Sequence, residues 1–172
     1  MADHVDEVLA QWSRQRPDLD TAPMAVLGRL SRLTQVVEAR QRATFAAHDL
    51  DAASFDVLAT LRRSDPPHEL TPGRLAASSM VTSGAVTQRL DRLEARGLVR
   101  RRRGDVDTRT VLVSLTEAGR AAVEGVLPDH LATGRDLLGP LDDDQRAQLA
   151  DLLRALLTAH EAAPDPDRTG AT

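Results

Sequence analysis

The sequence predicts a mainly α-helical protein with one β-hairpin, and three observations support this prediction. Apolar residues recur at the helical period through most of the chain, and proline and glycine separate the periodic stretches. One stretch, residues 111–115, alternates between two faces as a strand does. The chain has 172 residues, of which 41% are hydrophobic and 28% charged, so we expect one soluble, globular folding unit.

Two helices are expected in the N-terminal part. The first is short, ends before Arg16-Pro17, and carries one apolar stripe formed by Val5, Val8, Leu9 and Trp12. The second follows Pro23 and extends over most of residues 24–47. Its stripe, formed by Val26, Leu30, Leu33 and Val37, is expected to face a partner.

The central part predicts three further helices. The first covers Ser54 to Arg63, and the second begins at Thr71-Pro72, a favourable N-cap followed by proline at the first helical position. Only Met80-Val81 separates this short helix, residues 71–79, from the third helix, residues 82–96. Thr82-Ser83 should cap that third helix, and Gly97 should end it.

A basic hairpin follows the glycine. Its strands, residues 98–103 and 109–115, flank a Gly-Asp-Val-Asp turn, so alternate arginines should face opposite sides and Arg109 should lie near the tip. The whole chain has a net charge of -4, yet eight arginines stand against four acidic residues between Arg89 and Arg109. The positive charge is therefore concentrated on this part of the chain.

The C-terminal part predicts two helices and a polar tail. One helix covers residues 116–138, with a kink or break at Pro128, and the last is capped within Asp142-Asp143-Asp144. We divide the chain into N-terminal helices (1–47), a central lobe (48–115), C-terminal helices (116–163) and a flexible tail (164–172). The leucines of residues 149–157 have no obvious cover within the chain, so the terminal helices are expected to join a homodimer.

Helix, tight turn, helix, glycine and basic hairpin is the order of a winged helix-turn-helix. Val86, Leu90 and Leu93 should face the core, which turns the small polar residues of this helix toward a DNA major groove. The hairpin arginines would meet phosphates or a narrow minor groove. Two other interpretations stay open, namely that the polar helix face is merely solvated and that the arginines only protect a strand edge.

The chain resembles the MarR (multiple-antibiotic-resistance regulator) family of transcription factors over about residues 24–162. The resemblance lies in Leu90-Asp-Arg-Leu-Glu-Ala-Arg-Gly-Leu-Val99, Asp107-Thr-Arg109 and Val113-Ser-Leu-Thr-Glu-Ala-Gly119. It implies that Arg109 enters the minor groove and that Asp107 orients it, while Thr108 replaces one arginine of the family pattern. The residues expected at DNA are Thr82, Ser83, Thr87, Gln88, Arg92, Arg103, Asp107 and Arg109.

A narrower resemblance, through Gln11-Trp-Ser-Arg-Gln-Arg-Pro-Asp-Leu-Asp20 and Pro23-Met-Ala-Val-Leu-Gly-Arg-Leu30, is to the urate-responsive branch, which has an extra N-terminal helix. This resemblance implies a ligand site formed by Trp12, Asp56, Arg89 and Arg101, with the neighbouring Arg100 or Arg102 as the alternative wing arginine. By helical angle Arg89 points toward the body of the domain, where a guanidinium needs an anionic partner. Asp56 could instead be a solvated acid, and Trp12 could instead pack in the core.

Other functional classes find little support. The chain has no cysteine, no glycine-rich phosphate loop and no zinc-protease spacing, so we expect no enzyme and no cofactor. Five scattered histidines are expected at the surface rather than as metal ligands, although a metal-responsive regulator stays an alternative. The acidic N-terminus and the lack of long apolar runs suggest a cytoplasmic protein without a membrane partner.

We therefore expect a regulator, acting as a repressor, that binds a pseudo-palindromic operator as a homodimer. A small planar anion, urate or a related purine, would release it. Alternative effectors are a citrate- or aconitate-like acid and a phenolic compound, and a dimerising helical protein without DNA affinity is a further alternative.

Overall fold

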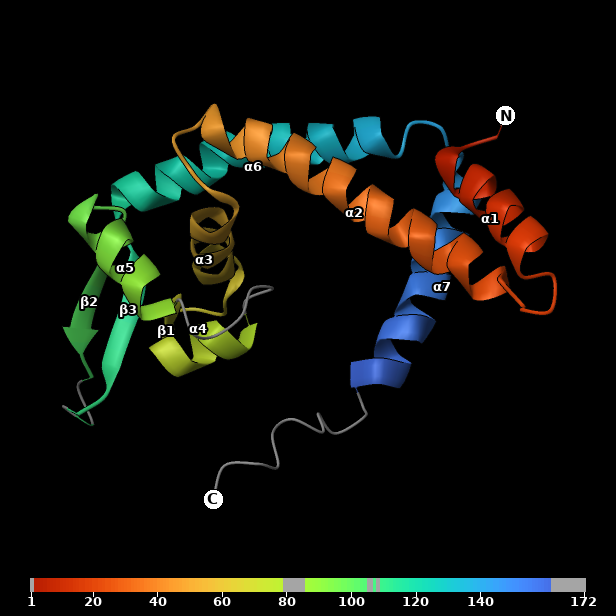
Figure 1. Ribbon diagram of the computed structural model, residues 1–172. Helices are drawn as coiled ribbons and strands as arrows, with labels where there is room; N and C mark the ends of the chain where they lie inside the picture. The colour runs from red at the N-terminus through yellow and green to blue at the C-terminus, as the bar shows by residue number, and fades with distance from the viewer. Residues whose placement is uncertain (1, 79–85, 105–106, 108, 162–172) are drawn as a thin grey trace, which may run out of the picture. The chain divides into compact units, whose positions relative to one another are not determined.

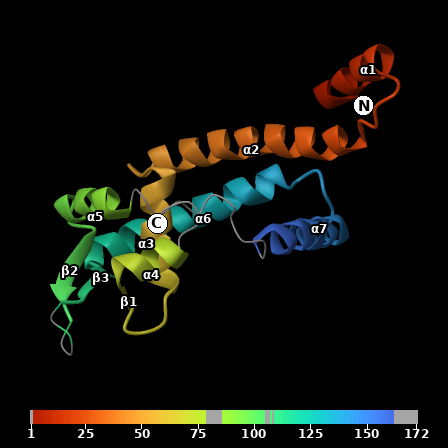
Figure 2. The same ribbon diagram turned by 60° about the horizontal axis from the view of Figure 1, so that its bottom comes forward.

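The computed structural model describes residues 2–78, 86–104, 107 and 109–161. The chain divides into a larger compact unit that extends to Thr133 and a smaller one that begins at Gly134. Seven helices and three strands lie in the described ranges (Figures 1 and 2). They are α1 (His4–Gln15), α2 (Ala22–Ala46), α3 (Ala52–Arg63), β1 (Glu69–Leu70), α4 (Pro72–Ser78), α5 (Val86–Ala95), β2 (Val99–Arg103), β3 (Val111–Leu115), α6 (Glu117–Leu137) and α7 (Asp143–Glu161).

Acidic side chains begin three of the helices. The carboxylate of Asp3 accepts the backbone N–H groups of Val5 and Asp6 at the start of α1, and Asp51 accepts the N–H of Ser54 in α3. At the start of α7, the carboxylate of Asp142 accepts the backbone N–H of Gln145, and the side-chain carbonyl of Gln145 accepts the backbone N–H of Asp142. This pair of hydrogen bonds is a capping box. The predicted cap of α7 is confirmed, whereas the predicted cap Thr82-Ser83 lies outside the described residues.

The small sheet is antiparallel with the strand order β1-β3-β2. The predicted hairpin is confirmed, because Val99 pairs with Leu115 and Arg103 with Val111. The two-residue strand β1 was not predicted; it adds Glu69 and Leu70 to the other edge of β3. A strand this short has no alternation that a sequence could reveal.

Three elements meet closely around Leu98. Gly97 ends α5 with a positive φ of 69°, a conformation that glycine adopts without strain. The hydroxyl of Thr116 donates to the carbonyl of Gly97 and accepts the N–H of Gly119, so it joins the end of α5 to the start of α6. A Cβ atom on Gly119 would overlap the carbonyl oxygen of Leu98, so only glycine permits this approach.

Of the predicted kink or break at Pro128, the break is wrong, because α6 continues from Glu117 through Pro128 to Leu137, while a kink stays a prediction. Proline inside a helix removes one N–H from the helical ladder and crowds the carbonyl four residues earlier, so the turn around it needs support from packing. Val123 and Val126, in the turn before the proline, are buried and hold this part of α6 against the core.

One hydrophobic core lies beneath the central elements. Its fully buried members include Leu58 and Leu61 of α3, Leu75 of α4 and Val113 of β3. Val86, Leu90 and Leu93 of α5 join this core, which confirms the face predicted for that helix.

Among the described helices, none combines the length and the apolar character that crossing a membrane requires.

His130 packs with the chain's two phenylalanines, so its predicted place at the surface is wrong. Its ring centroid lies 5.4 Å from that of Phe45 and 4.9 Å from that of Phe55, and the two phenylalanine rings stack at 4.6 Å. Burial lowers the pKa of His130 below its usual value of 6.5. Beside this cluster, His48 lies 2.8 Å from the carboxylate of Asp129.

We predict that Gly119→Ala lowers the free energy of unfolding by about 1–3 kcal/mol, because the added methyl group overpacks a backbone contact. Gly125→Ala is the matched control in the same helix, since a Cβ there meets nothing within 4 Å. It should be neutral or stabilise by up to about 1 kcal/mol, through helix propensity. Chemical denaturation of both variants measures the difference, and equal effects would contradict the packing argument.

We also predict that the His130 environment makes stability fall as the pH decreases below about 6.5. The unfolded chain binds a proton there that the folded chain does not, so one such group contributes at most about 1.4 kcal/mol per pH unit. His130→Phe should reduce this slope between pH 7 and pH 5, whereas His160→Gln on exposed α7 should leave it unchanged. Urea denaturation across this pH range is the measurement.

Candidate nucleic-acid interface and effector site

Helix α5 presents the side chains that were predicted to meet DNA. Because Val86, Leu90 and Leu93 are buried, Thr87, Gln88 and Arg92 lie on the exposed side of the helix. Thr and Gln can donate to and accept from base edges, and Arg92 can pair with a phosphate. Thr82 and Ser83 lie outside the described residues.

Asp107 binds the two residues that lead into the second strand of the hairpin. Its carboxylate accepts the backbone N–H of Arg109 at 2.9 Å and the hydroxyl of Thr110 at 3.1 Å. The N–H of Gly104 donates to the carbonyl of Thr110 at 2.9 Å and closes the tip. Asp107 thus holds the backbone from which Arg109 projects, and the side chains of Arg109 and Arg103 are exposed.

The predicted alternation of the wing arginines is confirmed. Arg100 and Arg102 share one face of the sheet, where Arg100 donates to the hydroxyl of Ser114 at 3.1 Å. Arg102 donates to both carboxylate oxygens of Glu69, at 2.9 and 2.6 Å. This bidentate pair lowers the pKa of Glu69 and ties β1 to the wing strand β2.

Arg101 lies on the opposite face, against α5. Its guanidinium is 2.6 Å from the carboxylate of Asp91 and 3.2 Å from that of Glu94, and it also donates to the carbonyl of Thr87 at 3.4 Å. The second oxygen of Glu94 accepts the backbone N–H of Arg101 at 3.1 Å. Sequence reasoning missed this contact, although the spacing of the two acids, three residues apart on one helix, was a usable signal.

Two further predicted ligand residues lie inside the lobe. Asp56 on α3 is only 9% exposed, so its interpretation as a solvated surface acid is wrong. Arg89 on α5 is half-buried, as its helical angle predicted, and its Nη1 atom is buried without a hydrogen-bond partner among the described residues. Helices α3 and α5 pack against each other.

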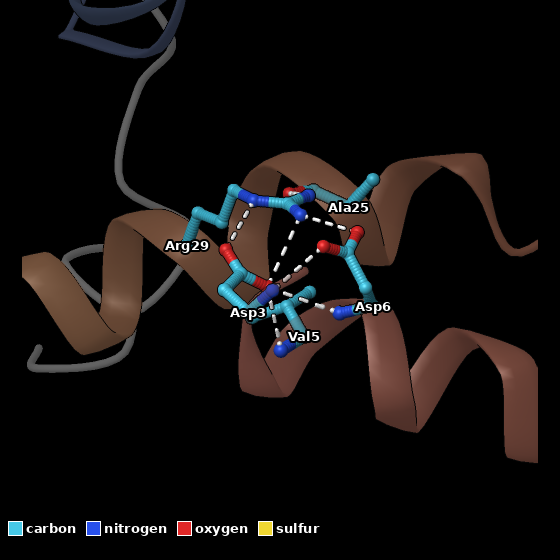
Figure 3. Close-up of polar contacts among 5 residues, drawn as sticks. All are labelled: Asp3, Val5, Asp6, Ala25 and Arg29. Atoms are coloured by element: carbon cyan, nitrogen blue, oxygen red, sulfur yellow. Dashed lines mark hydrogen bonds and ion pairs between the residues drawn. The ribbon is translucent and has the colours of Figure 1, made fainter. Parts of the chain in front are cut away.

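Trp12 lies apart from these residues within one chain. Arg29 of α2 holds α1 by donating to Asp3 at 2.8 Å and to Asp6 at 2.6 Å (Figure 3). This contact lies at the N-terminal end of α2, whereas α3 follows its C-terminal end (Figures 1 and 2). Trp12 is 41% exposed on α1, so the core-packing interpretation is wrong, and one chain does not bring it to Asp56.

The Arg29 contact favours the ionised form of both aspartates. The backbone N–H of Asp6 and the guanidinium of Arg29 lower the pKa of Asp3, and the backbone N–H of Asp3 together with Arg29 lowers that of Asp6.

Within the described ranges, no group of three or more histidine and acidic side chains could hold a metal ion.

The fold and the exposed polar helix beside a basic wing define a winged helix-turn-helix DNA-binding protein. Comparison with known proteins identifies the family: residues 48–110 match the MarR family. The HTH-type transcriptional regulator PecS of Dickeya dadantii (strain 3937) is 37% identical over 149 residues, which are 87% of this chain and 90% of PecS. The chain belongs to the MarR family of transcriptional regulators.

Two solved structures agree with this assignment. A variant of MarR from E. coli in complex with operator DNA has 32% identity and a TM-score of 0.69, over 81% of this chain and 99% of MarR. Bordetella bronchiseptica BpsR, whose DNA binding is regulated by 6-hydroxynicotinic acid, has 30% identity and a TM-score of 0.69, over 76% of this chain and 91% of BpsR.

We predict that Arg109→Ala and Gln88→Ala weaken DNA binding differently. Arg109→Ala should weaken binding to all duplexes and lower the salt slope by about one, because Arg109 meets phosphate or minor groove. Gln88→Ala should cost about 1–3 kcal/mol on the preferred sequence and little on random DNA, because Gln88 meets base edges. Fluorescence anisotropy on both duplexes at two salt concentrations tests this, and equal losses for Gln88→Ala would contradict its role.

Proposed function

We propose that this protein is a ligand-responsive repressor, which binds a pseudo-palindromic operator as a homodimer and leaves it when a small planar anion binds. Urate or a related purine is the first candidate effector. The proposed site contains Asp56, Arg89 and Arg101 of one chain.

The observation that carries the proposal is the half-buried guanidinium of Arg89. Its buried Nη1 is without a hydrogen-bond partner among the described residues, and a buried donor without a partner costs free energy. A planar anion would supply the missing acceptor in a bidentate geometry. Arg89 shares α5 with Thr87 and Gln88, so an anion on Arg89 would change the helix that reads DNA.

The resemblance to BpsR supports an effector of this class, because 6-hydroxynicotinic acid is itself a planar ring with a carboxylic acid group. A citrate- or aconitate-like acid is the second candidate, since several guanidinium groups can bind several carboxylates. The arginines at the site favour either anion over a neutral phenolic compound.

Exposed apolar side chains support the homodimer. Helix α2 exposes Val26 and Leu33 of the predicted stripe, and α7 exposes Leu152, Leu156 and Leu157. Apolar faces of this kind are usually covered by a partner. Helix α1, which carries Trp12, and α3, which carries Asp56, lie at opposite ends of α2, so in this proposal the partner's Trp12 reaches the site across the dimer interface.

We predict that urate quenches Trp12 fluorescence and weakens DNA binding by about 5–150-fold, the usual scale of such coupling. A duplex selected by the protein from a random pool serves as the DNA. Arg89→Ala should still bind this duplex but resist release by urate. Arg100→Ala is the control, because Arg100 contacts Ser114 and should not alter release. Release of Arg89→Ala at the parent's urate concentration would place the site elsewhere.

A further inference from the structure

The wing (β2, β3 and the turn between them) and the DNA-reading helix α5 are joined by a short connection. Only Arg96, Gly97 and Leu98 separate α5 from β2, and Gly97 has a positive φ of 69°. Two-site binding is tighter when both parts are held in the geometry that the ligand requires. A contact that sets the angle of the wing relative to α5 therefore strengthens DNA binding through both the major and the minor groove.

The contacts of Arg101 form such a brace. Its guanidinium reaches Asp91, Glu94 and the carbonyl of Thr87, which span two turns of α5. Glu94 contributes most directly to this contact. One of its carboxylate oxygens accepts a hydrogen bond from the guanidinium at 3.2 Å, and the other accepts one from the backbone N–H of Arg101 at 3.1 Å. Glu94 thus binds both the side chain and the main chain of Arg101 in β2.

We propose that Glu94, assisted by Asp91, is a positioning residue for DNA binding: it holds the wing at the angle to α5 at which Arg109 and Gln88 engage DNA together. Glu94 itself is an acid and does not attract phosphate. Its contribution comes through Arg101 and through the orientation of β2.

For the loss of Glu94, this role predicts a change in DNA affinity opposite to the change that charge repulsion alone predicts. Removing a carboxylate from a DNA-binding lobe reduces repulsion of phosphates and should tighten binding. If Glu94 positions the wing, Glu94→Ala should instead weaken binding to the selected duplex, by about three- to thirtyfold. Alanine is a good helix former and Glu94 is exposed on the surface of α5, so the helix should persist.

The matched control is Asp65→Asn. Asp65 is an exposed acid of the same lobe, and no ion pair of its side chain is found among the described residues. Its neutralisation should leave binding unchanged or make it tighter. Thermal unfolding of each variant checks that the lobe remains folded. If Glu94→Ala unfolds the lobe, Asp91→Ala is tested in its place. This variant keeps the hydrogen bond between Glu94 and the backbone of Arg101, and it should also weaken DNA binding.

A double-mutant cycle with Arg109 tests the mechanism. In the parent, Arg109→Ala should cost about tenfold in affinity; in the Glu94→Ala background it should cost about threefold or less, because the wing is no longer held at the groove. Asp65→Asn should leave the cost of Arg109→Ala unchanged. The cycle rests on the predicted role of Arg109, whereas the sign of the Glu94→Ala effect does not. Unchanged or tighter binding by Glu94→Ala would overturn the proposal.

Discussion

The DNA-binding lobe depends on the close approach of backbone at Leu98. At this point α5 ends, β2 begins and α6 starts, and the carbonyl of Leu98 accepts the backbone N–H of Thr116 at 3.1 Å. The approach requires glycine twice, once at Gly97 for its positive φ and once at Gly119 for lack of a Cβ atom. The wing is thereby attached to the recognition helix at one end and to α6 at the other.

The arginines of the hairpin do not all serve the same purpose. Arg100, Arg101 and Arg102 are bound by Ser114, by the acids of α5 and by Glu69, so they hold the wing in place. Arg103 and Arg109 are exposed toward the end of the hairpin, where a nucleic acid could reach them. An overall negative chain can bind DNA because its positive charge is both concentrated here and partly left exposed.

The site proposed for an effector illustrates how far residue types alone can lead. Arg89 could be placed toward the body of the lobe from its helical angle, and its half-buried position agrees. The burial of Asp56 could not be predicted, because a polar stripe on α3 looks the same whether solvent or another helix covers it. The separation of Trp12 from Asp56 within one chain also depends on the course of α2, about 37 Å long at 1.5 Å per residue, which no local pattern describes.

The sequence by itself determined the helices, the cap of α7, the hairpin and the buried face of α5, because these depend on the helical period, on N-cap side chains and on residues near one another in the chain. Tertiary structure alone decided the pairing of β1 with β3, the packing of His130 against Phe45 and Phe55, and the partners of the wing arginines. Glu69 and Arg102 are 33 residues apart, and Phe45 and His130 are farther still. Contacts over such separations depend on how the elements pack, and the pattern within each element does not encode that packing.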